Sequence, residues 1–275
     1  MSVAGLPSGG VRSAPGKAAI RLARRSASLW IASLTILVGF AAARPGEAQP
    51  SELGLVPEQV IGSVAGPPGT VFGEIVDGLI LPDGRIVALD RLFHEVRLFS
   101  AEGRHLASSG RGGDGPGEFR HFEAVDFDAG LGLSVLDRGA FRLSWYDVAG
   151  DSLSFRGSVR IPFQAYTHCT VAGRIYLVGV HEGRMIHEVA PSGEILRSFG
   201  EPVDAPAIPE PFAGTVQRHF STGPLECDED RRAIFWMMSG TGRISSFDLD
   251  GNPRWSRQYP GFMPLDSEIT ERGTH

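Results

Sequence analysis

Two carboxylates and an aromatic residue occur at one fixed distance before the glycines of a recurring turn. Asp77, Glu123 and Tyr166 each lie seven residues before such a glycine, and His168 follows two residues after Tyr166. Equal offsets from equivalent turns place side chains at equivalent points of successive strands. We therefore expect these four residues to lie near one opening of the fold, where carboxylate oxygens would hold a cation or a basic ligand. The alternative is that both acids are ordinary exposed residues.

Catalytic residues are not predicted by any other local pattern. His168 and Cys169 are neighbours, but adjacent residues of a strand point to opposite faces and cannot easily share a proton. The segment Asp248–Asn252 resembles a calcium loop, yet it has no third oxygen ligand before its glycine and no later glutamate, so a hairpin turn is favoured. The sequence predicts no cofactor, and calcium is the one metal ion whose binding it leaves as a possibility.

Two further motifs are predicted to be structural. The run GRGGDGPG at 110–117 contains the GxGxxG spacing, but it leads into a strand, whereas a dinucleotide site must open a helix. Asp90 and Asp137 end two strands and are each followed by an arginine. We expect these carboxylates to accept backbone N–H bonds that fix a turn, and the arginines to pair with a carboxylate on the neighbouring repeat; the alternative is a ring of charge that binds a ligand.

A pattern of an aromatic or apolar residue, three residues and a glycine recurs four times. The copies are FSAEG (99–103), YDVAG (146–150), VAPSG (189–193) and FDLDG (247–251). A second turn lies 15–17 residues before each copy, and only the fourth of these, near Asp230, lacks a glycine. Two β-rich runs separate each pair of turns, for example RIVALD and EVRLF in the first copy.

These repeats predict the fold class. A unit of four strands in roughly 43–47 residues has the size of a β-propeller blade. Propeller blades pack face to face, which explains runs that are nearly all apolar. A β-sandwich would not explain two turns that return at nearly fixed spacing. We therefore predict an all-β propeller with four visible four-stranded antiparallel blades and no helix.

The chain resembles six-bladed β-propellers of the NHL-like or TolB-like type found in exported bacterial proteins. The likeness rests on IGSVAGPPGTVFGEI (61–75), DGRIVALDRLFHEVRLFSAEGRHL (83–106) and GRGGDGPGEF (110–119). The third copy departs from it, because Val180 stands where the first two copies have Asp90 and Asp137. The resemblance implies six blades where four are visible, so the chain is expected to be truncated or to have lost blades, which would leave an open edge.

The first 48 residues have the pattern of a secretory signal peptide. Basic residues precede an apolar run from Leu29 to Ala43, and Gly46-Glu47-Ala48 supplies a small-residue cleavage site. An uncleaved N-terminal membrane anchor is the alternative, although the run is shorter than a spanning helix needs. The expected organisation is a signal peptide (1–48), a linker (49–60), blades (61–262) and a tail or the start of a missing blade (263–275). The mature protein is then periplasmic or extracellular, with no membrane span.

The charge of the chain limits the classes of binding partner, and its cysteine content allows one disulfide. Beyond residue 48 the chain carries 20 basic and 31 acidic residues, a net charge of −11. Such a domain repels phosphate backbones, so nucleic acid is not an expected partner. Cys169 and Cys227 are the only cysteines; they could pair in an oxidising compartment, and the sequence does not decide between a disulfide and two free thiols.

The segment 200–220 is about a dozen residues longer than the other links between repeats. Its four prolines predict an extended, stiff loop. We expect it on the same opening as Asp77 and Glu123, where it could present Phe212 or Phe220 to a partner; an ordinary packed excursion is the alternative. Phe212 therefore joins Asp77, Glu123, Tyr166 and His168 as a candidate ligand-binding residue.

Three functions are compatible with these features. The preferred interpretation is a non-enzymatic binding scaffold for a peptide, glycan or protein partner. The alternative is a metal-dependent propeller hydrolase or lyase with its site at the channel mouth. It is weakened because lactonase-like propellers use asparagine among their calcium ligands, and Asn252 is the single asparagine here. A third possibility is a subunit whose open edge pairs with another chain.

Overall fold

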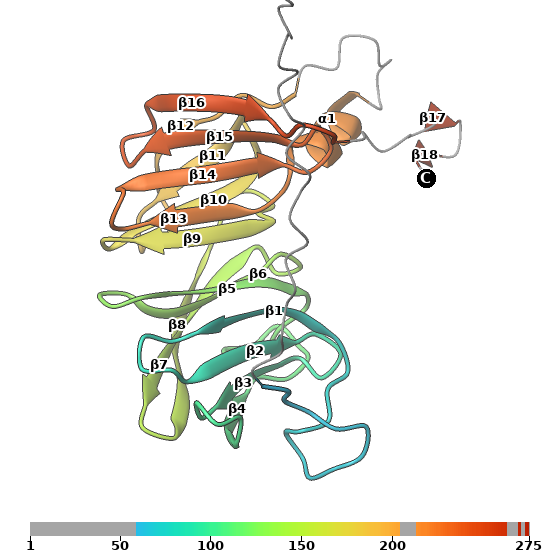
Figure 1. The fold of residues 1–275 in the computed structure, drawn as a ribbon, viewed down its shortest axis with the longest axis vertical. Coiled ribbons are helices and arrows are strands. Elements are labelled where there is room, and N and C mark those ends of the chain that lie inside the picture. The colour runs from blue at the N-terminus through green and yellow to red at the C-terminus, as the bar shows by residue number, and fades with distance from the viewer. Residues whose placement is uncertain (1–58, 204–212, 263–268, 271–272, 275) are drawn as a thin grey trace, which may run out of the picture. The chain divides into compact units, whose positions relative to one another are not determined.

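The computed structural model describes residues 59–203, 213–262, 269–270 and 273–274. Within them, four sheets share one design: four consecutive strands pair antiparallel in chain order (Figure 1). The first blade contains β1 (Ile75–Ile80), β2 (Ile86–Asp90), β3 (Glu95–Phe99) and β4 (His105–Ser109). The second contains β5 (Phe122–Asp128), β6 (Gly132–Asp137), β7 (Arg142–Ala149) and β8 (Ser152–Arg160).

The other two blades repeat this order. The third contains β9 (Thr167–Val171), β10 (Arg174–His181), β11 (Arg184–Val189) and β12 (Ile195–Phe199). The fourth contains β13 (Leu225–Asp228), β14 (Ala233–Met238), β15 (Arg243–Asp248) and β16 (Pro253–Gln258). A short pair, β17 (Ile269–Thr270) with β18 (Gly273–Thr274), follows. The prediction of a propeller with four four-stranded blades is confirmed. The proposed leader and Phe212 lie outside the described residues.

The blades pack through apolar faces. Val87, Leu89, Val96 and Leu98 of the first blade are fully buried and belong to one cluster with residues of the second blade, including Leu133. Two further clusters join the second blade to the third and the third to the fourth. The first strands β1, β5, β9 and β13 follow one another as neighbours toward the middle, whereas β4 and β16 lie at the periphery (Figure 1). The first strands are therefore the elements that can line a central space.

Three of the four recurring glycine turns have the same geometry. Ser100, Ala190 and Asp248 each donate their N–H to the carbonyl oxygen four residues on. The glycines of these turns, at 103, 193 and 251, have φ between 80° and 86°, a conformation that costs other residues energy. The near-constant spacing in the sequence thus reflects one turn used three times.

The second copy differs from the predicted turn. Strand β7 continues through Tyr146 to Ala149, because Asp147, Val148 and Ala149 all pair with residues of β8. The chain reverses only at Gly150, whose φ is 54°. The hairpin is longer than expected because YDVA has no residue that prevents it from continuing the ladder.

A helix, α1 (Ala213–Ser221), is the main departure from the predicted all-β chain. The extended-loop prediction for 200–220 is therefore wrong over the second half of the segment. All four prolines precede residue 213, so none interrupts the helical hydrogen bonds. Val216 is buried, and Ser221 Oγ accepts a 2.8 Å hydrogen bond from Val203 N. Packing against the chain that enters the segment thus holds the helix in place.

Candidate functional site

A cavity of about 660 Å³ lies where the first strands of the four blades converge. It is lined by residues of β1, β5, β9 and β13, by His219 of α1 with the segment that follows the helix, and by the turn at 239–240. We call it the central cavity. Its polar and charged lining residues used below are Asp77, Glu123, Asp126, Tyr166, His168 and Glu226. Four of the five residues selected from the sequence therefore line one space, and the fifth, Phe212, is not described.

Asp77 joins the first blade to the second. Its Oδ2 accepts a 2.8 Å hydrogen bond from Val125 N, on β5, and its Oδ1 accepts one of 2.8 Å from Gly78 N. A Cβ at position 78 would lie 2.8 Å from the Val87 carbonyl oxygen, so the backbone here tolerates glycine alone. Both oxygens of Asp77 thus already have backbone donors, which makes the residue a link between strands as well as a source of negative charge.

Asp126 makes the equivalent link between the second blade and the third, and the sequence reasoning missed it. Its Oδ2 accepts hydrogen bonds from Thr170 N and, at 2.7 Å, from Thr170 Oγ1. Burial raises the pKa of this carboxyl above its ordinary value, and the two Thr170 donors oppose that effect. A backbone hydrogen bond from Phe127 also lowers the pKa. The available signal was an acidic residue in the middle of an apolar first strand.

A disulfide between Cys169 and Cys227 links the third blade to the fourth. The Cα atoms of Cys169 on β9 and Cys227 on β13 are 5.6 Å apart. The disulfide thus occupies the place in the blade series that Asp77 and Asp126 occupy earlier. Each neighbouring pair of first strands around the central cavity is therefore joined by one side-chain link.

Glu226 lies beside Cys227, and the sequence did not predict it as a site residue either. Desolvation raises the pKa of its carboxyl, and the negative charges of Asp126 and Asp77 raise it further. Its carboxylate has no hydrogen-bond or ion-pair partner among the described residues. The charges of Asp77 and Asp126, on two other blades, therefore act on Glu226 across the central cavity.

His168 supplies a second kind of polar group. Its side chain is only 3% exposed, and its Nε2 lies 2.7 Å from Ser134 Oγ. Nδ1 is buried and has no partner in the described part of the chain. Burial lowers the pKa of His168 to about 4, although the Asp77 charge opposes this effect. The imidazole is therefore neutral at pH 7.

Glu123 faces the central cavity but its charge is compensated. It pairs with Arg138 at 2.9 Å, with His121 at 3.0 Å and more distantly with Arg91 at 3.7 Å. The Arg138 guanidinium also lies 5.3 Å from the centre of the Tyr166 ring, a cation–π contact. We expected Asp77 and Glu123 to form one pair of carboxylates at the opening. Glu123 instead belongs to an arginine-rich rim, and the carboxylates that accompany Asp77 are those of Asp126 and Glu226.

The turn-fixing role predicted for Asp90 and Asp137 is confirmed. Asp90 accepts hydrogen bonds from the backbone N–H groups of residues 73, 74 and 93. Asp137 accepts them from residues 120, 121 and 140. Arg91 pairs mainly with Glu74 of its own blade and lies 3.7 Å from Glu123 on the next, and Arg138 reaches Glu123 within its own blade, so the expected pairing between blades is met only by the longer Arg91 contact.

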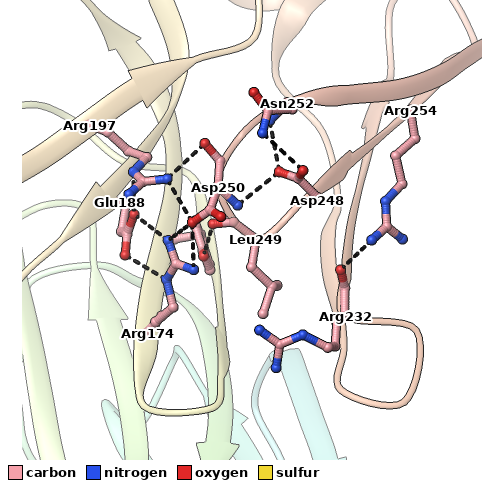
Figure 2. A network of polar contacts seen from close by, with 10 residues as sticks. Arg174, Glu188, Arg197, Arg232, Asp248, Leu249, Asp250, Asn252 and Arg254 are labelled. Carbon is pink, nitrogen blue, oxygen red and sulfur yellow. Dashed lines mark hydrogen bonds and ion pairs between the residues drawn. The ribbon is translucent and has the colours of Figure 1, made fainter.

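The other two motifs also have structural partners. Arg142 donates hydrogen bonds to carbonyl oxygens at 114, 115 and 118, which holds the glycine-rich link between the first two blades. Asp248 accepts hydrogen bonds from the N–H groups of Asp250 and Asn252, and Asp250 pairs with Arg174 and Arg197, as Figure 2 shows. These carboxylates thus fix the turn and tie it to the third blade.

One of the comparisons with known proteins, a solved structure with a TM-score above 0.5, supports the propeller fold. No family model matches the sequence, and no curated protein matches it. A solved Bacteroides fragilis structure described as a "Putative exported protein" is similar at 13% identity with a TM-score of 0.54; the match covers 75% of this chain and 58% of that one. A virginiamycin B lyase from Staphylococcus aureus matches at 13% identity and a TM-score of 0.46, covering 68% of this chain and 56% of its own. The chain therefore spans a little over half the length of these structures.

Among the described residues, no helix has both the length and the apolar character needed to span a membrane.

Proposed function

We propose that this protein is an exported, non-enzymatic propeller scaffold that binds its ligand in the central cavity. The observation that carries the proposal is the convergence of all four first strands on one open space of about 660 Å³. Cavities of about 300–1,000 Å³ are typical of small-molecule and side-chain binding sites. A peptide or glycan would enter with one or two groups in the cavity and leave the rest on the arginine-rich rim.

The links between strands support a binding role for this space. Asp77, Asp126 and the Cys169–Cys227 disulfide fix the spacing of the four first strands. A site whose walls are already fixed loses little conformational entropy when a ligand binds. The same network thus stabilises the blades and preorganises the cavity.

A cavity-filling variant tests the proposal. Ser239 lines the cavity, is exposed and makes no side-chain hydrogen bond to described residues, so Ser239→Trp should fold and fill part of the space. Ser154→Trp, on the exposed side of β8, is the matched control. Purified protein would be screened by thermal shift against peptides, glycans and amines, and hits measured by calorimetry. We expect Ser239→Trp to weaken each hit at least tenfold and Ser154→Trp to leave it unchanged; equal affinities for both variants would refute a cavity site.

A metal-dependent hydrolase or lyase is the competing function. It would need at least three ligating side chains arranged around one ion, and no such group occurs in the described residues. Calorimetric titration with calcium distinguishes the two functions. Stoichiometric calcium binding that is lost in Glu226→Gln would favour the enzyme and lead to lactone and ester substrates.

A further inference from the structure

Acidic side chains outnumber basic ones in the lining of the central cavity, where four carboxylates accompany two histidines, His168 and His219. No arginine or lysine occurs among its described lining residues, whereas Asp77, Asp126 and Glu226 all contribute carboxylates. The nearby arginines Arg91 and Arg138 pair with Glu123 on the rim. A ligand that brings positive charge would therefore relieve the repulsion among these carboxylates.

The cavity is also rich in unused hydrogen-bond acceptors. Both carboxylate oxygens of Glu226 have no hydrogen-bond donor among the described residues. His168 gives a second, independent indication. It lines the cavity, it is only 3% exposed, and its Nδ1 has no hydrogen-bond partner in the described chain. Buried polar atoms normally have a partner. The complement to this set is a cation with several N–H donors.

Apolar walls accompany these acceptors. Leu79, Leu225, Pro224 and the Tyr166 ring contribute to the lining. Arginine and lysine side chains have the same mixed character, an apolar stem with a charged head. A single metal ion uses neither the apolar surface nor the volume of about 660 Å³.

We infer that the central cavity takes a guanidinium or primary ammonium group on an alkyl stem, with Glu226 as its ionic partner. Asp126 and Asp77 contribute long-range attraction. The stem lies against Leu79 and Leu225. The inference rests on the proposed function and specifies its ligand class. The group can belong to a free amine or to a basic residue of a peptide, since both offer the same chemistry.

The first experiment compares matched ligands by calorimetry on the mature chain. Agmatine represents a free cation, N-acetylarginine amide represents a peptide-borne one, and N-acetylcitrulline amide replaces the guanidinium by an uncharged group of similar shape. We expect the arginine compound to bind at least tenfold more tightly than the citrulline compound, with affinity that falls as salt rises. Agmatine binding as tight as the amide supports a free amine, and preference for the amide supports a peptide.

The second experiment identifies the ionic partner. Glu226→Gln keeps the shape and removes the charge; Glu229→Gln makes the same change on an exposed glutamate beyond the end of β13. We expect at least a tenfold loss of affinity for agmatine in the first variant and no change in the second. Equal affinities in the two variants, or equal binding of arginine and citrulline compounds, would overturn the inference.

The cavity-filling variant Ser239→Trp distinguishes failure of the cationic-ligand inference from failure of the proposed function. A neutral glycan or peptide that binds the unmodified chain but not Ser239→Trp would leave the cavity as the site and refute only the cationic ligand. Hits that bind equally to Ser239→Trp and to the unmodified chain would refute both. Calcium binding that depends on Glu226, without agmatine binding, would replace the organic cation by a metal ion.

Discussion

His168 makes the stability of the fold depend on pH in a definite direction. Its pKa is about 4 in the folded chain and 6.5 as an ordinary value, so the unfolded chain takes up the proton first. The contribution of this residue to the free energy of unfolding is full above about pH 6.5 and is lost as pH falls toward 4. The loss is on the order of 3 kcal/mol for a shift of this size.

The measurement is urea unfolding between pH 7 and pH 4.5. His168→Gln keeps a polar side chain but does not titrate, so its free energy of unfolding should fall less steeply over this window than that of the unmodified chain. The raised pKa values of Asp126 and Glu226 act in both proteins and cancel in the comparison. Parallel curves for the two proteins would show that His168 does not carry the effect.

The sequence predicted part of the site because turn glycines fix positions along the first strands. This is why Asp77, Glu123, Tyr166 and His168 all line the central cavity. It missed Asp126 because constant spacing assumes an unbroken ladder, and it missed Glu226 because the fourth copy has no turn glycine from which to count. Register shifts between Ile75 and Asp77 and between Phe122 and Ala124 change which residues lie side by side. The sequence also does not show which side chains form ion pairs, so it could not predict that arginines compensate the charge of Glu123.

At the scale of elements, the strands and turns could be predicted from the sequence, whereas the side-chain links between strands of different blades could not. Short β-rich runs bounded by glycine turns carry a local signal, so the four blades could be predicted. The nine-residue helix α1 carries little local signal, and it is held by a contact between Ser221 and Val203 that spans 18 residues. The pairing of Cys169 with Cys227 depends on which blades are neighbours, which the sequence alone left open.

Reduction of the disulfide should loosen the fourth blade. The bond closes a loop across a separation of 58 residues, for which loop entropy predicts a contribution of about 4 kcal/mol to the free energy of unfolding. We expect dithiothreitol to lower the urea midpoint and to increase amide exchange in β13–β16 more than in β1–β4. The double variant Cys169→Ala, Cys227→Ala should be destabilised without dithiothreitol and unaffected by it. An unchanged midpoint on reduction of the unmodified chain would contradict the link.

At the scale of the whole molecule, three apolar interfaces join the four described blades, and one face of the first blade is covered by none of the other described blades. Part of that face is covered by the segment 61–73. Arg97, on β3 and only 2% exposed, donates a 2.6 Å hydrogen bond to the Val71 carbonyl oxygen and pairs with the buried Asp90 at 3.2 Å. Its guanidinium lies 5.1 Å from the ring centres of both Phe72 and Phe93. Arg97 thus fastens this segment over the end face of the propeller.

Removing Arg97 should therefore affect the association state as well as stability. Arg97→Ala leaves Asp90 buried without its ionic partner, a change that costs roughly 3–5 kcal/mol in comparable buried pairs. Release of the segment would also expose Phe72 and Phe99, and uncovered apolar surface promotes association. We expect faster amide exchange across 61–73 and a shift to larger species in size-exclusion chromatography. Arg104→Ala, which removes an exposed arginine from the same blade, should change stability by less than about 1 kcal/mol and leave the elution volume unchanged. If Arg97→Ala elutes and exchanges as the unmodified chain does, the segment is held by other contacts and the end face does not depend on it.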